Sequence, residues 1–206
     1  MQENKVNQNI NKILDFWFGD VQKLKLNNVN SSMMLWFSGY PEIDQLIDNK
    51  FRKLIEKAIL GHFDIWMKTP EGCLALIILL DQFPLNIFRN QARSFTVCHM
   101  ALPYALTAIK LGYDKLLSQQ KKSFIYLPLE HAEDINLQNL SVELYSKEYE
   151  NSSPAERQFC KINLDYALKH KRVIELFGRF PNRNKILGRI STKSELEFLE
   201  REGAGF

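Results

Sequence analysis

Three clusters of polar side chains follow apolar stretches of the chain, and each cluster contains a proline near its start. They occupy residues 81–89, 126–134 and 177–184. The clusters combine arginine, which binds carboxylates and phosphates through paired N–H donors, with histidine and carboxylate side chains, which transfer protons. Their composition indicates a site for an anion, with or without acid–base chemistry.

The candidate ligand-binding residues come from all three clusters. We expect each proline to end its helix, because proline lacks a backbone N–H and clashes with the preceding turn. These are the third, fifth and seventh expected helices, and the ends of alternate helices in an up-and-down array meet at one rim. The prediction requires that Pro103 kinks its helix and does not split it. The candidates are Asn86, Arg89, Glu130, His131, Arg179, Asn182, Arg183 and Asn184.

Two interpretations of these clusters remain open. In one, the arginines pair with carboxylates of the same protein and hold loop ends together. In the other, part of the set faces a pocket and binds an anionic or amide-bearing ligand. For a catalytic role, the candidates for the acid or base are His131 and Glu130. We expect His170 to be a core or surface residue.

Metal and nucleophile motifs are missing from the sequence. The segment around His131 lacks the HExxH spacing, and His131 and Glu133 would point to different sides of a helix. There is no glycine-rich phosphate loop and no nucleophile motif. We therefore predict no bound metal and no cofactor, and we leave open whether the protein is an enzyme.

Hydrophobic residues recur at three- and four-residue spacing along almost the whole chain, which is typical of helices that pack through one face. The apolar run 74–80 resembles a buried strand, but the capped start at Thr69-Pro70 favours a helix. We expect an irregular connection at 20–40. We predict an all-α fold of antiparallel αα-hairpins without a β-sheet, with helices at 6–18, 41–60, 70–82, 92–111, 115–126, 134–149, 154–177 and after Thr192.

Composition and charge are those of an ordinary globular chain. The 206 residues are 45% apolar and 12% aromatic, so we expect a single helical domain over residues 1–206 that needs no metal or disulfide. The net charge of +3 is too small to indicate nucleic acid, although residues 161–193 contain nine basic and two acidic side chains. Nucleic acid is therefore not expected as a partner.

Cysteine usage and apolar run length favour the cytoplasm. Cys73, Cys98 and Cys160 are widely spaced and fit neither a disulfide framework nor a zinc motif. The longest apolar run, 73–80, is much shorter than the roughly twenty residues of a membrane-spanning helix. The first residues lack the basic and apolar regions of a signal peptide. We expect a cytoplasmic protein with no membrane partner.

Several longer motifs resemble those of one bacterial family, the domain of unknown function 924 (DUF924). The motifs are ILDFWFG at 13–19, LALIILLDQFP at 74–84, NIFR at 86–89, YLPLEH at 126–131, FGRFP at 177–181 and LGRIST at 187–192. The resemblance extends from 13 to 206 and implies a tetratricopeptide-like, right-handed helical array, but no established activity. The chain departs from the family pattern at Leu85, Cys98 and Asn182, where the family usually has arginine, aspartate and histidine.

Three classes of function follow. The first is a binding module that holds a small anionic ligand or a peptide carboxylate, as helical-repeat proteins hold peptides in a concave groove. The second is an enzyme acting on a small anionic substrate, with His131 or Glu130 as acid or base and Arg89 or Arg183 on the anion. The third is a structural or assembly protein whose clusters only fix its own loops. The sequence does not identify the oligomeric state.

Overall fold

The predicted all-α fold is confirmed. The computed structural model describes residues 2–24, 26 and 31–201, and within these ranges it contains helices and turns but no β-strand. The α-helices are α1 (Gln2–Phe18), α2 (Ser32–Phe37), α3 (Pro41–Ile59), α4 (Pro70–Leu80), α5 (Gln82–Ile87), α6 (Ala92–His99), α7 (Leu102–Lys110), α8 (Gln119–Glu130), α9 (Ile135–Glu150), α10 (Arg157–Phe177) and α11 (Lys193–Leu199). The 3-10 helices are η1 (Val21–Leu24), η2 (Asp64–Lys68), η3 (Asp114–Leu116) and η4 (Pro181–Arg183).

The chain divides into two compact units, and each is described by itself. Unit 1 consists of Met1–Arg89 and Arg93–Pro128, and unit 2 of Asn90–Ala92 and Leu129–Phe206. The expectations of a single domain over residues 1–206 and of a tetratricopeptide-like array therefore stay predictions. The ends of the predicted domain and part of the predicted connection at 20–40 lie outside the described residues.

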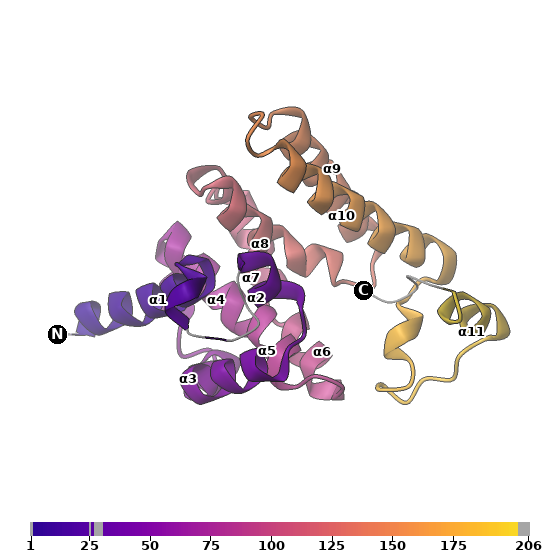
Figure 1. Cartoon of the computed structure of the whole chain (residues 1–206), viewed down its shortest axis with the longest axis horizontal. Helices are drawn as coiled ribbons and strands as arrows, with labels where there is room; N and C mark the ends of the chain where they lie inside the picture. The colour runs from indigo at the N-terminus through magenta and orange to yellow at the C-terminus, as the bar shows by residue number, and fades with distance from the viewer. Residues whose placement is uncertain (1, 25, 27–30, 202–206) are drawn as a thin grey trace. The chain divides into compact units, whose positions relative to one another are not determined.

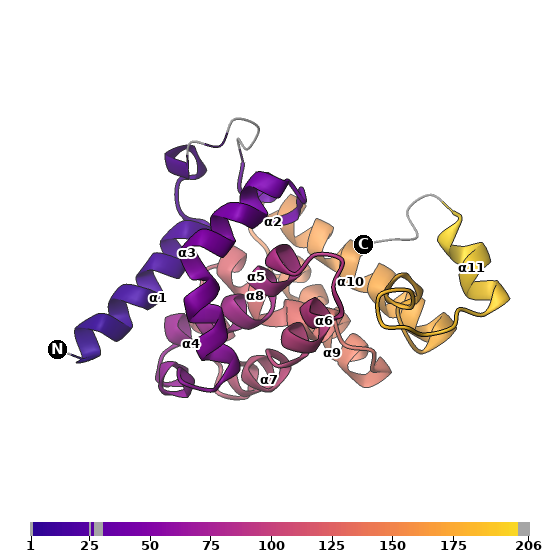
Figure 2. The ribbon, with the colours of Figure 1, turned by 90° about the horizontal axis from the view of Figure 1, so that it is seen from below.

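Unit 1 is built around α4, which packs against α1, α3, α5 and α7 (Figures 1 and 2). Every residue of α4 from Gly72 to Leu80 is buried, which explains why its sequence is apolar on all sides. Thr69 caps the helix by accepting a hydrogen bond from the N–H of Gly72, and Pro70 occupies its first turn, as predicted.

Residues 70–87 are long and apolar enough to cross a membrane by length and composition alone. However, 78% of this segment is buried inside the protein, and its path is divided between α4 and α5. Such burial is the behaviour of the central helix of a globular core.

Unit 2 contains an antiparallel hairpin of α9 and α10, followed by η4 and α11 (Figure 1). The C-terminal half of α10 packs its apolar face against Phe180 and Phe198, which closes a small core with Val173 and Ile174. Gly178 ends α10 in the left-handed conformation, with φ of 66°, as its position after Phe177 predicts. The chain therefore turns sharply back toward the hairpin at this glycine.

The prolines of the three polar clusters do not end their helices, so this prediction was wrong. Pro84 lies in the first turn of α5, where its missing N–H would have had no partner within the helix. Pro128 lies inside α8, which continues to Glu130, and Pro181 begins η4. The helices end instead at Leu80, Glu130 and Phe177.

Pro103 splits its helix, as proline can when it supplies the first turn of a new one. The predicted helix at 92–111 is divided into α6 and α7, with Pro103 in the first turn of α7. The prediction of a common rim counted residues 92–111 as one helix, and this count was therefore wrong.

Several element boundaries also differ from the sequence prediction. The connection at 20–40 is not irregular throughout, because it contains η1 and α2, whose start Ser31 caps. The helix predicted at 115–126 begins at Gln119 and runs past 126, and the helix predicted at 154–177 begins at Arg157.

Candidate functional site

Unit 2 holds two groups of polar side chains that the sequence places far apart. The first group joins the end of α8 to α10 and η4, and we call it the histidine cluster: Glu130, His131, His170 and Arg183. The second group ties the segment after α10 to the hairpin, and we call it the C-terminal ion-pair cluster: Glu133, Arg179, Asn184, Arg189 and Glu195.

The end of α8 is fixed by one buried amide. The carbonyl groups at the end of a helix lack partners within the helix and need donors from elsewhere. Nε2 of the buried Gln138 lies 2.7 Å from the carbonyl oxygen of Glu130, 2.9 Å from that of Ala132 and 3.3 Å from that of Leu129. Gln138 therefore holds the backbone that carries Glu130 and His131.

A carboxylate and an imidazole are buried together at the centre of the histidine cluster. The side chains of Glu130 and His170 are only 2% and 10% exposed, and Oε2 of Glu130 lies 3.3 Å from Nδ1 of His170. Nδ1 of His170 also lies 2.9 Å from the carbonyl oxygen of Tyr166, one turn earlier in α10. Burying ionisable groups costs free energy unless they contact one another. Such buried pairs are frequent at functional sites, which makes this pair a site candidate.

The imidazole of His170 is neutral over the physiological range. Burial lowers its pKa to about 3, against the opposing effect of the contact with the carbonyl oxygen of Tyr166. The nearby basic residues His131, Arg183 and Lys169 lower the pKa of His170 further.

Arg183 covers the edge of the same cluster. One of its terminal nitrogens donates a 2.9 Å hydrogen bond to the carbonyl oxygen of His131, and its guanidinium lies 4.3 Å from the ring centroid of Phe180. The ring of Phe180 also packs edge-on against His170, at 5.6 Å between ring centroids. Arg183 and His131 are half-buried, whereas the neighbouring Asn182 is exposed. The partly exposed side chains of Arg183 and His131 thus lie at the boundary between the buried pair and solvent.

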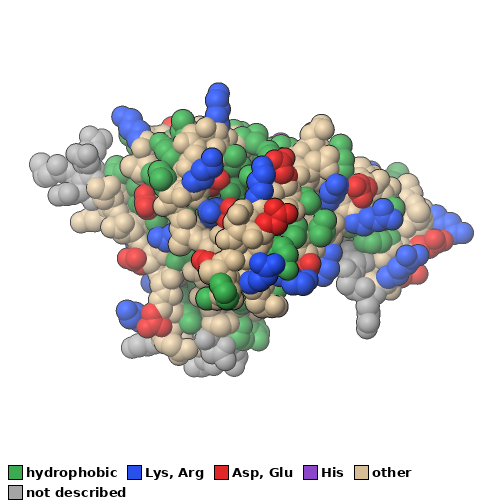
Figure 3. Space-filling view, turned by 90° about the horizontal axis from the view of Figure 1, so that it is seen from above, with side chains coloured by type: hydrophobic (Ala, Val, Ile, Leu, Met, Phe, Trp, Pro, Cys, Tyr) green, Lys and Arg blue, Asp and Glu red, His purple; other side chains and the backbone are tan. Residues whose placement is uncertain are grey.

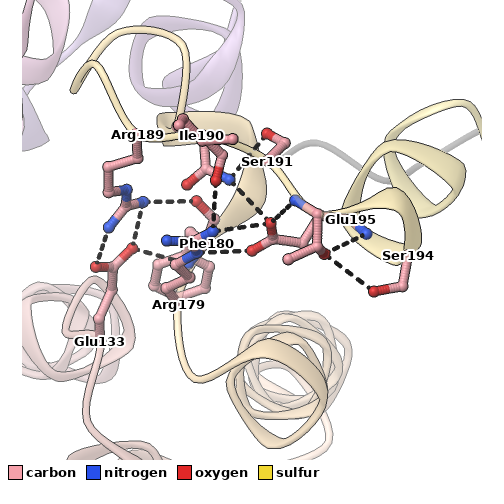
Figure 4. Close-up of polar contacts among 10 residues, drawn as sticks. Glu133, Arg179, Phe180, Arg189, Ile190, Ser191, Ser194 and Glu195 are labelled. Atoms are coloured by element: carbon pink, nitrogen blue, oxygen red, sulfur yellow. Dashed lines mark hydrogen bonds and ion pairs between the residues drawn. The ribbon is translucent and has the colours of Figure 1, made fainter.

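In the C-terminal ion-pair cluster, Glu133 receives three hydrogen bonds (Figure 4). Arg189 donates to both carboxylate oxygens, at 2.6 and 2.9 Å, and the backbone N–H of Phe180 donates at 2.8 Å. Arg189 also donates to the carbonyl oxygen of Phe180, at 3.0 Å. Burial alone would raise the pKa of Glu133, but the bonds from Arg189 and Phe180 and the charge of Arg183 lower it.

Arg179 holds the start of α11 in the same way (Figure 4). Its guanidinium donates to both oxygens of the buried Glu195, at 2.7 and 2.9 Å, and to the carbonyl oxygen of Ile190. Glu195 is also the acidic member of the capping box with Thr192, which the sequence predicted. The bond from Arg179 lowers the pKa of Glu195 to about 2, with the N–H of Thr192 and the amide of Asn184 adding to the effect.

Asn86 lies in α5 of unit 1, and Arg89 follows this helix and contacts α3. The guanidinium of Arg89 donates to both oxygens of Asp44, at 2.8 and 2.9 Å, and to the side-chain oxygen of Asn86, at 3.1 Å. The bond with Asp44 raises the pKa of Arg89. The meeting of these two residues with the other candidates stays a prediction, because the units are described separately.

Unit 1 also buries a thiol against a carboxylate. Sγ of Cys98 lies 2.7 Å from Oδ1 of Asp81, and Gln82 donates to the same carboxylate. Cys98 thus contributes a donor at a position where the family resemblance implies aspartate. With aspartate there, two buried carboxylates would meet, and one would have to hold a proton or a cation.

The basic residues of 161–193 do not form a single positive surface. Lys161 pairs with Asp165 at 2.6 Å, while Lys171 and Arg172 both approach Glu175 at 3.7 Å. On the face drawn in Figure 3, lysine and arginine side chains are interspersed with aspartate and glutamate. A positive stripe for a phosphate backbone would need unpaired charges in a row.

Sequence reasoning did not select His170, Arg189 and Glu195 of these clusters as site candidates, nor Gln138, which holds the end of α8. A signal existed for His170, because it shares a helical face with the buried Ala167, Val173 and Ile174. Tyr166, one turn before His170, is 48% exposed. No local signal exists for Arg189, whose partner lies 56 positions away.

The buried pair alone does not make a metal centre. Glu130 and His170 offer one carboxylate and one imidazole, both of which bind zinc in proteins, but zinc sites use three or four protein ligands. The predictions of no metal and no cofactor stay predictions.

The fold and its clusters define an all-α protein with a buried carboxylate–imidazole pair, and comparison with known proteins gives the family. The model of a family described as bacterial protein of unknown function (DUF924) matches residues 13–203. A solved structure, the protein of unknown function ATU0120 from Agrobacterium tumefaciens, is similar with a TM-score of 0.78 and 32% sequence identity, over 95% of this chain and 98% of that chain. A comparison with curated proteins finds no match. The chain belongs to the DUF924 family.

Proposed function

We propose that the protein binds a small anionic ligand at the histidine cluster of unit 2. The observation that carries the proposal is the buried pair of Glu130 and His170, which lies beside the half-buried Arg183 and His131. Ionisable groups buried together beside partly exposed basic residues are typical of binding and catalytic sites. A buried pair with a purely structural role would not need Arg183 and His131 at its edge.

In this proposal Arg183 and His131 contact the anion. A guanidinium has five N–H donors, so one arginine can hold a backbone carbonyl and an anion together. The stacking of Arg183 on Phe180 and its bond to the carbonyl oxygen of His131 support a fixed orientation of the guanidinium. Preorganised donors of this kind lower the entropic cost of binding. A peptide carboxylate and a free small anion would use the same donors.

The other arginines support a second candidate function, which is purely structural. Arg179, Arg189 and Arg89 each bind both oxygens of a carboxylate of this chain. We therefore propose that they and Asn184 hold the fold together and do not contact the ligand. Asn182 is exposed and stays a candidate ligand contact.

We also propose a cytoplasmic location and a single helical domain over residues 1–206. Three free, buried cysteines support a reducing compartment, although they do not establish it. A small anionic molecule or a peptide stays the proposed partner.

Thermal-shift measurements test the proposal. Wild-type protein is compared with Arg183→Ala, Arg183→Lys and the control Arg172→Ala, which removes a 68% exposed arginine of α10. The probes are inorganic phosphate, sulfate, succinate and short peptides with free or amidated C-termini. A ligand at about a hundred times its Kd adds about 2.7 kcal/mol to the free energy of unfolding, which raises the melting temperature by several degrees.

We expect the shift in wild type and in Arg172→Ala, a weaker shift in Arg183→Lys and none in Arg183→Ala. Arg183→Lys keeps the positive charge and so separates loss of binding from loss of folding. A shift that is unchanged in Arg183→Ala would contradict the proposal. A shift with free but not amidated peptides would identify a peptide carboxylate as the ligand.

A further inference from the structure

One carboxylate holds both ends of the loop that carries Arg183. Glu133, in the turn before α9, accepts the backbone N–H of Phe180 at 2.8 Å, and the guanidinium of Arg189 donates to it at 2.6 and 2.9 Å. Arg189 also donates to the carbonyl oxygen of Phe180, at 3.0 Å, so the two ends of the loop contact one another (Figure 4). Residues 180–189 thus form a closed loop on Glu133, and Arg183 lies within this loop.

The loop belongs to a longer segment, residues 179–201, which buries few of its side chains and which we call the C-terminal strap. Its buried residues are Phe180, Pro181, Asn184 and Glu195. Two of these are polar, whereas the apolar Ile190 and Leu196 are 90% and 51% exposed. A segment that buries few apolar side chains costs little free energy to open. We therefore expect the C-terminal strap to open more readily than the hairpin of α9 and α10.

A small apolar contact and a charged contact attach the C-terminal strap to the hairpin. The ring of Phe180 packs on Val173 and Ile174 of α10. The charged contact is the pair of Arg189 and Glu133, whose side chains are only 23% and 25% exposed. Hydrogen bonds between charged groups that are largely removed from solvent contribute more than exposed ion pairs. Removing the charge of Glu133 should therefore make the strap open more often.

We propose that the C-terminal strap opens as a unit, that Glu133 keeps it closed, and that the anion binds only to the closed form. This inference rests on the proposed function and describes how that site is regulated. Opening of the strap takes Arg183 away from the carbonyl oxygen of His131, so the open form lacks the pair of residues that would hold the anion. A ligand that binds one of two forms shifts the population toward that form, so the anion in turn holds the strap closed.

The first test is hydrogen–deuterium exchange of the full chain without ligand, followed by mass spectrometry. The backbone N–H groups of Asn184, Leu187 and Arg189 are hydrogen-bonded within the strap, at 3.0, 2.9 and 2.8 Å, and so report its opening. We expect them to exchange faster than the N–H groups in the middle of α10. Equal rates would mean that the strap opens only when the whole unit unfolds, which would overturn the inference and leave the proposed function standing.

Two glutamate variants test the role of Glu133 in the same experiment. Glu133→Gln weakens the charge-assisted bonds to Arg189, and we expect exchange in the strap to become at least about tenfold faster than in wild type. Glu143→Gln is the matched control, because it removes a pair with Lys147 in which both side chains are more than half exposed. Its strap should exchange at nearly the wild-type rate. Unchanged exchange in Glu133→Gln would overturn the inference, whereas the proposed function does not involve Glu133 and would stand.

The second test adds inorganic phosphate or succinate at about a hundred times the Kd that calorimetry gives for wild type. Binding to the closed form alone should slow exchange about a hundredfold in both the strap and α10. We expect this slowing in wild type and Glu143→Gln, less in Arg183→Lys and none in Arg183→Ala. Slowing in α10 without slowing in the strap would show that the open form also binds the anion, which overturns the inference alone. If neither anion binds wild type, the proposed function and the inference both fail.

Discussion

Glu133 and Arg189 lie 56 positions apart in the sequence, yet Arg189 donates to both oxygens of the Glu133 carboxylate, at 2.6 and 2.9 Å. The same carboxylate accepts the backbone N–H of Phe180, so it ties the segment after α10 to the turn before α9. A fork-shaped guanidinium on a carboxylate is a strong and directional contact.

The first prediction concerns the stability that this contact contributes. Glu133→Gln should lower the free energy of unfolding by about 2 kcal/mol, because charge-assisted hydrogen bonds of a half-buried group are lost. Glu143→Gln is the matched control, since Glu143 pairs with Lys147 where both side chains are more than half exposed. Surface pairs contribute about 0–1 kcal/mol, so the control should unfold close to wild type in urea. Equal losses for the two variants would contradict the prediction.

The second prediction is a loss of stability in acid that depends on Glu195. Its pKa in the folded protein is about 2, below the ordinary value of 4.5, so the unfolded chain binds more protons between these values. The stability that Glu195 contributes is complete above about pH 4.5 and is lost as the pH falls toward 2. Glu195→Gln, which keeps the size of the side chain, should give a flatter profile of unfolding free energy across this range. A profile as steep as that of wild type would show that other carboxylates dominate.

The third prediction concerns His170, whose pKa is lowered in the folded protein from 6.5 to about 3. In that interval the unfolded chain binds the proton and the folded chain does not, so stability falls as the pH is lowered from about 6.5 to about 3. His170→Gln should remove this component while leaving the steeper loss below pH 4.5. Urea unfolding of wild type and variant at several pH values in this range measures it. A difference confined to pH values above 6.5 would contradict the assignment.

The fourth prediction tests the turn after α10. Gly178 has φ of 66°, and a Cβ at this position would meet no atom within 4 Å, so only backbone strain opposes a side chain. Gly178→Ala should therefore cost about 1 kcal/mol, and Gly178→Asn less, because asparagine tolerates this conformation better. Thermal unfolding of the three proteins gives the order glycine, asparagine, alanine. An alanine variant as stable as wild type would mean that the turn relaxes at no cost.

Local signals in the sequence predicted the helices better than the contacts between them. The capped start at Thr69, the helix start after Thr192 and the helix end at 177 were predicted because each depends on residues within a few positions. The role of Pro128 was mispredicted because proline near a helix end removes few hydrogen bonds, and packing can compensate for them.

The partners of the candidate arginines could not be predicted in this way. Arg89, like Arg183, follows a proline and an asparagine in its cluster. Its carboxylate partner is nevertheless Asp44 on α3, 45 positions away. Such pairs depend on how helices pack, which periodicity does not specify. The sequence showed which segments carry polar clusters but not which of their side chains bind other residues of the same chain.

The amide of Gln138 has a consequence for sequence evolution and for protein ageing. Its nitrogen faces three carbonyl oxygens at the end of α8. Glutamate has the same shape, and one base change in a glutamine codon, or deamidation of the side chain, produces it. The exchange would replace the donor by an acceptor and place a negative charge at the negative end of a helix dipole. Position 138 is therefore closed to a substitution that a single base change makes accessible, and deamidation of this amide would remove the donor that holds the end of α8.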